Sequence, residues 1–61
     1  MVQVIEYGED IGTLKNLFRD EQAAIKFVKT IMDDADGEYT QLGPNNWYCA
    51  TKKEYVKIES I

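Results

Sequence analysis

The chain has 61 residues, enough for one small domain and too few for a catalytic domain joined to a regulatory one. Hydrophobic residues make up 44% and charged residues 30%, proportions typical of globular proteins rather than disordered ones. Eleven acidic against seven basic residues give a net charge of −4, which disfavours binding to nucleic acid or to anionic lipid. We therefore expect a single soluble domain over residues 1–61, with no membrane span and no signal peptide.

The numbers of cysteines and histidines limit the kinds of reaction and of binding site that the chain can support. The chain has one cysteine, Cys49, which has no partner for an internal disulfide, and this is typical of a reducing cytoplasm. The chain has no histidine, so the commonest general base and metal ligand near neutral pH is missing. Because Cys49 lies between apolar residues and has no histidine to activate it, we expect a buried structural thiol. The sequence therefore predicts a cytoplasmic protein that is not an enzyme.

The first third of the chain predicts strands. Residues 2–7 are β-branched and aromatic, which favours a strand, and residues 8–12 hold two glycines and two acids, which indicates a turn. Residues 13–18 fit either a second strand, with Leu14 and Phe18 on one face, or the beginning of a helix. We favour the strand, because a better helix start lies just beyond it, but the helix remains an alternative.

The middle of the chain predicts one amphipathic helix over residues 20–36. Asp20 is suited to cap its first turn, because a carboxylate there accepts from free backbone N–H groups and carries favourable charge. Gly37 is placed to end the helix with a positive φ. Apolar residues recur with helical period at Ala24, Phe27, Val28, Ile31 and Ala35.

The last part of the chain predicts three further strands. Residues 38–42 and 47–51 flank the turn sequence of residues 43–46, which indicates a hairpin. Residues 54–61 alternate, with Val56 and Ile58 on one face. The order β-β-α-β-β-β predicts an α+β domain with one helix packed on one face of a mostly antiparallel sheet. Because one helix covers only one face, some of the large aromatic residues are expected to be exposed.

The segment from residue 33 to residue 38 is the most acidic part of the chain. Asp34, Asp36 and Gly37 match the middle of a calcium-binding loop, but Met32 and Gly43 then occupy positions where that loop needs carboxylates. Acids at a helix C-terminus oppose the helix dipole, so they indicate a role in solubility or partner binding rather than stability. We predict no catalytic residue, no cofactor and no metal site.

These features favour a small, acidic, non-enzymatic protein-binding module. It would be of the kind that a phage or bacterium encodes to inhibit or modulate a host protein that handles nucleic acid. Carboxylates would steer it to a basic surface and aromatics would supply contact area. The predicted partner-binding residues are Asp33, Asp34, Asp36, Glu38, Tyr39, Trp47, Tyr48 and Tyr55. Two alternatives stay open: a homodimer that buries the aromatics, and a binder of single-stranded nucleic acid that uses them with nearby lysines.

Overall fold

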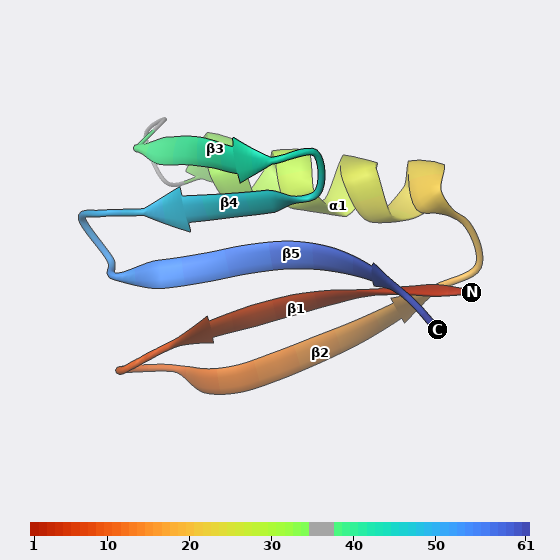
Figure 1. The fold of residues 1–61 in the computed structure, drawn as a ribbon, viewed down its shortest axis with the longest axis horizontal. Coiled ribbons are helices and arrows are strands. Elements are labelled where there is room, and N and C mark those ends of the chain that lie inside the picture. The colour runs from red at the N-terminus through yellow and green to blue at the C-terminus, as the bar shows by residue number, and fades with distance from the viewer. Residues whose placement is uncertain (35–37) are drawn as a thin grey trace.

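A computed structural model describes residues 1–34 and 38–61 of the chain. The described part forms one sheet of five antiparallel strands and one helix, so the predicted α+β class and element order are confirmed (Figure 1). Residues 13–18 are strand, as favoured, and not helix. The elements are β1 (Val2–Gly8), β2 (Gly12–Phe18), α1 (Glu21–Asp34), β3 (Tyr39–Gly43), β4 (Asn46–Cys49) and β5 (Glu54–Ser60).

The sheet has the strand order β2-β1-β5-β4-β3. The first and the last strand are neighbours inside the sheet: β1 pairs with β5 over seven residues, from Val2↔Ser60 to Gly8↔Glu54. The Ile61 N–H donates to the Met1 carbonyl at 3.1 Å, which extends this pairing by one residue (Figure 1). The strands β2 and β3 therefore form the two edges.

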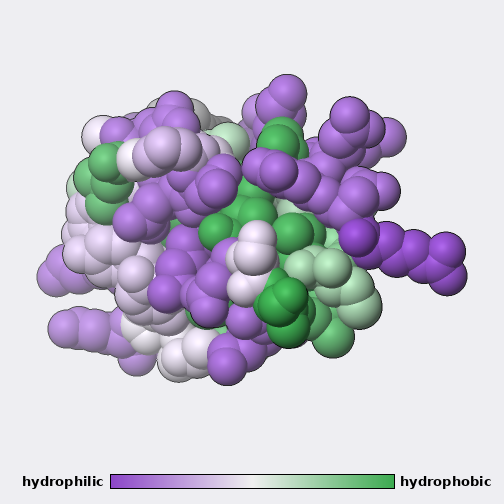
Figure 2. Space-filling view, turned by 45° about the vertical axis from the view of Figure 1, so that its right-hand side comes forward, coloured by the Kyte–Doolittle hydropathy of each residue, from purple (hydrophilic) through white to green (hydrophobic). Residues whose placement is uncertain are grey.

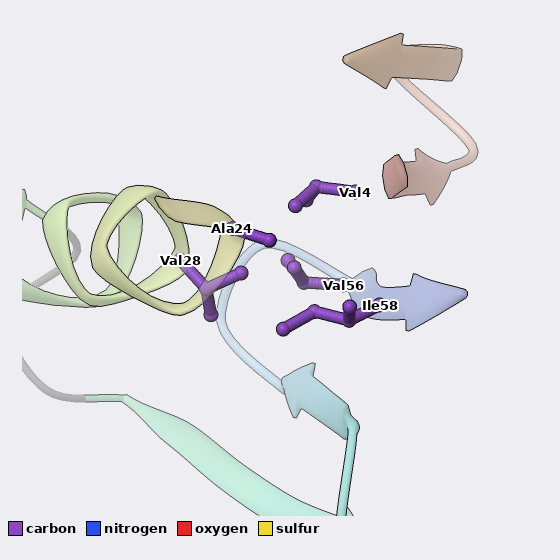
Figure 3. Packing of buried hydrophobic residues seen from close by; sticks show 5 residues of the cluster. All are labelled: Val4, Ala24, Val28, Val56 and Ile58. Carbon is purple, nitrogen blue, oxygen red and sulfur yellow. The ribbon is translucent and has the colours of Figure 1, made fainter. Parts of the chain in front are cut away.

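The helix begins as predicted at Asp20, whose Oδ1 accepts from the Ala23 N–H at 2.9 Å. The predicted helix end at residue 36 and the exit at Gly37 lie outside the described residues. One face of α1 packs on the sheet: Ala24 and Val28 are buried against Val4, Val56 and Ile58. Figure 3 shows the strands in an arc beside the helix, with these side chains in the space between.

Strand alternation assigns every side chain to one of two faces. Even-numbered residues of β1, β2 and β5 face the helix. Trp47 lies opposite Val56, so odd-numbered residues of β4 also face the helix, as do Tyr39 and Gln41 before the register shift in β3. We call the other face, which α1 does not cover, the open face. The predicted alternation of residues 54–61 is thus confirmed, with Val56 and Ile58 toward the core.

One predicted strand is shorter than expected. Residues 47–51 were predicted to be extended, but β4 ends at Cys49, and residues 50–53 form a turn in which Lys53 has a φ of 56°. The turn is required because β5 must reverse direction to pair with β4 from Glu54 onward. It passes close to β1: a Cβ on Gly8 would lie 2.8 Å from the Lys53 carbonyl oxygen. Gly8 is therefore needed where the turn meets the sheet.

The two edges of the sheet differ in regularity. β3 has five residues and a register shift between Gln41 and Gly43, and Pro44 follows it directly. β2 has seven residues in unbroken register with β1, and none of them is buried. A bulge and a nearby proline discourage pairing with another chain, whereas a long regular strand permits it.

Candidate functional site: a tyrosine row on the open face

Three tyrosines form a row across the open face. Tyr7 of β1 lies directly opposite Tyr55 of β5, and Tyr55 lies opposite Tyr48 of β4. The ring centroids are 5.0 Å apart for Tyr7 and Tyr55, and 4.6 Å apart for Tyr48 and Tyr55. All three side chains are half-buried. We call these residues the tyrosine row.

Two rings of the tyrosine row, those of Tyr7 and Tyr55, are stacked, whereas the Tyr48 ring is tilted by 41° from that of Tyr55. The Tyr7 and Tyr55 planes are 11° from parallel, and their separation matches the spacing of about 4.8 Å between paired strands. Two parallel rings at that distance must overlap face to face, because rings lying in one plane would collide. One face of the Tyr7 ring is therefore turned toward one face of the Tyr55 ring.

Two lysines lie next to the row on the open face. Lys15 and Lys57 are both directly opposite Ile5, one on each side. Ile5 is only 7% exposed although no helix covers it, so its neighbours on the open face must shield it. Lysine stems commonly cover apolar residues in this way while the ammonium stays in water.

The Lys57 ammonium lies close to the Tyr7 ring of the tyrosine row. Its Nζ lies 5.8 Å from the centroid of the Tyr7 ring and 3.3 Å from Glu59 Oε2. The first contact is within the range of a cation–π interaction, and the second is an exposed ion pair of small energy. Lys15 has no such carboxylate among the residues that the structure describes. The open face thus carries positive charge although the whole chain is negative.

Two shallow hollows lie on the open face, one on each side of Tyr7. The first, of about 500 Å³, is bounded by the tyrosine row, Thr13, Lys53 and the acidic residue Glu9. The second, of about 470 Å³, is bounded by Tyr7, Ile5, Lys15 and Lys57. Both are open to solvent, which suits an inserted side chain of a partner better than an enclosed small molecule.

Exposed apolar residues gather at the end of the sheet where the two chain ends meet. Met1, Leu17 and Ile61 are 67%, 61% and 70% exposed, and continued alternation places all three on the open face. Figure 2, in which this end is turned toward the viewer, shows apolar side chains collected among hydrophilic ones. The open face therefore combines aromatic, cationic and apolar groups.

The predicted partner-binding residues do not form one surface. Tyr48 and Tyr55 belong to the tyrosine row, but Tyr39 and Trp47 face the helix and pack against the core. The acidic members are dispersed: Asp33 and Asp34 end α1, Glu38 is exposed before β3, and Asp36 lies outside the described residues. Tyr7, Lys15 and Lys57 were not among the predicted site residues. Tyr7 alternates with Val4, but the apolar Ile5 lies on the same face as Tyr7, so the sequence carried no signal that marked Tyr7 as a surface residue.

A separate polar group lies on the helix side of the sheet. Burial, and next the charge of Glu54, raise the pKa of the Glu6 carboxyl, while Lys52 lowers it. Burial is also the main cause that raises the pKa of Tyr39 to about 12, with further contributions from Cys49, Glu54 and Glu6. The Tyr39 hydroxyl is buried and has no hydrogen-bond partner among residues 1–34 and 38–61. None of these residues bounds a hollow of the open face.

Outside the open face, the described residues bear on three further features: the cysteine, metal binding and membrane insertion. Cys49 is fully buried, which confirms the predicted buried thiol. In the described part of the chain, no three histidine, cysteine, aspartate or glutamate residues are grouped to hold a metal ion. Over the same residues, no helix combines the length and apolar character needed to cross a membrane. No protein family, curated protein or solved structure matches the chain.

Proposed function

We propose that the chain is a non-enzymatic protein-binding module that binds its partner with the open face. The tyrosine row supports this proposal most directly, since three half-buried tyrosines lie together on a sheet face that α1 leaves uncovered. Tyrosines already ordered by stacking lose little conformational entropy when a partner covers them. They also belong to the residue types that are most enriched in binding hot spots.

The charge of the open face indicates the chemistry of the partner. Three lysines, Lys15, Lys53 and Lys57, border the hollows, against two carboxylates, Glu9 and Glu59, of which Glu59 is already paired with Lys57. A segment that carries carboxylates beside apolar side chains would place its charges next to these lysines and its apolar groups in the hollows. We therefore propose an acidic protein segment as the partner. A basic partner would instead bind at Asp33 and Asp34 on the helix, away from the tyrosine row.

The ring arrangement favours a protein over single-stranded nucleic acid. Binding of unpaired bases relies on aromatic rings whose faces are free to stack. In the tyrosine row, the facing sides of Tyr7 and Tyr55 are occupied by each other. The net charge of −4 also works against a polyanion.

Selection of peptides on the folded domain tests this proposal. A random peptide library is panned against the immobilised domain, and the best peptide is titrated into isotope-labelled domain and followed by NMR. We expect acidic peptides with aromatic or aliphatic residues, and shifts centred on β1, β5 and β4. Basic peptides, or shifts confined to α1, would contradict the proposal.

Matched variants assign the affinity to the open face. The double change Tyr48→Ser and Tyr55→Ser should weaken peptide binding at least about tenfold, as loss of a hot-spot pair does. Leu42→Ser is the control, because Leu42 is also exposed but lies in β3, outside the row. A fluorescent oligothymidylate should not bind; tight, salt-sensitive binding of it would favour the nucleic-acid alternative instead.

A further inference from the structure

The edge strand β2 has the features of a strand that pairs with another chain. The proposed binding by the open face does not account for them. The outer side of β2 has no partner strand among the described residues, and its register shows no bulge. It presents large apolar side chains on both faces: Leu14 on the helix side is 48% exposed, and Leu17 on the open face is 61% exposed. Such an edge is a template for another strand.

Symmetry restricts how β2 can pair with β2 of a second copy. A two-fold axis perpendicular to the sheet makes the two strands antiparallel and keeps the same face of both sheets on one side. Only residues on the same face then lie opposite each other, so the axis must pass through a residue position. Within Gly12–Phe18, an axis at Lys15 pairs seven residues, axes at Leu14 and Asn16 pair five each, and an axis at Leu17 pairs three. The Leu14 axis leaves the exposed Leu17 outside the pairing, so Lys15, Asn16 and Leu17 are compared.

Charge selects among these centres. An axis at Lys15 places the two lysines directly opposite each other, and an axis at Leu17 places Lys15 opposite Arg19 of the second copy. Both arrangements oppose like charges, which destabilises strand pairing. An axis at Asn16 opposes Lys15 to Leu17 of the second copy, with no like charges opposite. It also brings the two Asn16 amides together, and amides can both donate and accept.

The same register also matches the apolar residues on the helix side. With the axis at Asn16, Leu14 lies opposite Phe18 of the second copy. Phe18 is half-buried and packs on Phe27 of α1, with ring centroids 5.1 Å apart. Leu14 would thus extend the core of the second copy, and symmetry repeats this contact. On the open face, the Lys15 stem would cover Leu17.

We propose that the chain forms a homodimer in which β2 pairs antiparallel with β2 of a second copy about a two-fold axis at Asn16. The product is a continuous sheet of ten strands with both helices on one side. Both tyrosine rows lie on the other side and remain uncovered, while Lys15 both borders a hollow of the open face and contacts Leu17 of the second copy. A dimer presents two binding faces to one partner molecule or to two.

Substitution of Leu17 by a positively charged or a negatively charged residue tests the dimer. In solution, light scattering during size exclusion over a concentration series should give twice the 7.0 kDa mass of one chain for the wild type. Leu17→Lys sets lysine opposite Lys15 of the second copy twice, so we expect dimerisation at least about tenfold weaker. Leu17→Glu creates two opposite-charge pairs instead and should keep the dimer. A monomeric wild type, or equal dimerisation of the two variants, overturns the proposal.

Disulfide trapping tests the register. Residues directly opposite in antiparallel strands have Cα atoms about 4.5–5.5 Å apart, within the range of a disulfide. Asn16→Cys should therefore give covalent dimers on mild oxidation, whereas Lys15→Cys, and Thr40→Cys on the other edge, should not. Cys49 is fully buried and should not compete. Equal linkage at all three sites, or linkage through Lys15→Cys alone, overturns the pairing about Asn16; circular dichroism verifies that each variant is folded.

Discussion

Tyr7 and Tyr55 stack face to face across the β1–β5 pair, with ring centroids 5.0 Å apart and planes 11° from parallel. The two residues belong to strands from opposite ends of the chain. Their contact is therefore part of the proposed binding surface, and it also stabilises the pairing of β1 with β5, which are far apart in the sequence. A cross-strand aromatic pair contributes about 0.2–1 kcal/mol beyond an alanine pair, a notable share in so small a domain.

Tyr55 should matter more for stability than Tyr48. Tyr55 contacts both other rings of the row, whereas Tyr48 contacts only Tyr55 among the described aromatic pairs. We expect Tyr55→Ser to lower the free energy of unfolding by about 1 kcal/mol more than Tyr48→Ser, measured by urea denaturation. Tyr55→Phe keeps the stacking and should stay within about 0.5 kcal/mol of the wild type. Equal losses for the two serine variants would contradict the central place of Tyr55.

The buried hydroxyl of Tyr39 should reduce stability. Because it has no hydrogen-bond partner among the described residues, its desolvation is not compensated there. Tyr39→Phe should leave the free energy of unfolding unchanged or raise it by up to about 1 kcal/mol at pH 7. A loss above that size would show that the hydroxyl is bonded in solution.

Tyr39 should also make stability depend on alkaline pH. Its pKa in the folded chain is raised from 10.0 to about 12, so the folded state holds this proton more tightly than the unfolded state. Stability should therefore fall as pH rises between these two values. The wild type is expected to lose more stability than Tyr39→Phe over this interval in thermal melts. Parallel losses would remove Tyr39 as the cause.

Glu6 should make stability depend on acidic pH. Burial and the charge of Glu54 raise the pKa of Glu6 above 4.5, so the folded state favours the protonated carboxyl. Stability from this group should be present below pH 4.5 and decline as pH rises through the raised pKa. Glu6→Gln should therefore be more stable than the wild type at pH 7, with a gap that shrinks on acidification. Melts at several pH values measure this, and a gap independent of pH would contradict it.

Gly8 should resist substitution while Gly43 tolerates it. A Cβ on Gly8 would lie 2.8 Å from the Lys53 carbonyl oxygen and 3.0 Å from Glu54 Cγ, whereas one on Gly43 meets nothing within 4 Å. We expect Gly8→Ala to cost about 1–3 kcal/mol, the usual range for forced displacement of packed backbone. Gly43→Ala should be near neutral. Urea denaturation of both variants decides, and similar values for the two would contradict the close approach at Gly8.

The fold could be predicted from sequence where a local signal was unambiguous. The cap at Asp20, the helical period after it and the alternation around Val56 each match one kind of element. Residues 13–18 gave no such signal, since the spacing of Leu14, Leu17 and Phe18 suits a helix face as well as a strand. Pairing with β1 over the whole of β2, closed by Gly12 with a φ of 69°, makes this segment a strand.

The candidate site could be predicted only in part, because side-chain direction in a strand depends on register. Trp47 and Tyr48 are neighbours in sequence and point to opposite faces, and only the pairing with β5 shows which of them faces the helix. In β1, both faces are apolar: Val4 lies in the core, and Ile5 is buried on the open face between Lys15 and Lys57. Alternation alone therefore could not assign Tyr7 to the surface.

The pairing of β1 with β5 also governs when the chain can fold during synthesis. β5 occupies the middle of the sheet, between β1 and β4, and it is made after the other four strands of the sheet. Until residues 54–60 have left the ribosome, the β1–β2 hairpin and the β3–β4 hairpin have no strand to join them. A lone hairpin is marginal in water. The nascent chain should thus stay unfolded until that strand emerges, and then fold in one step.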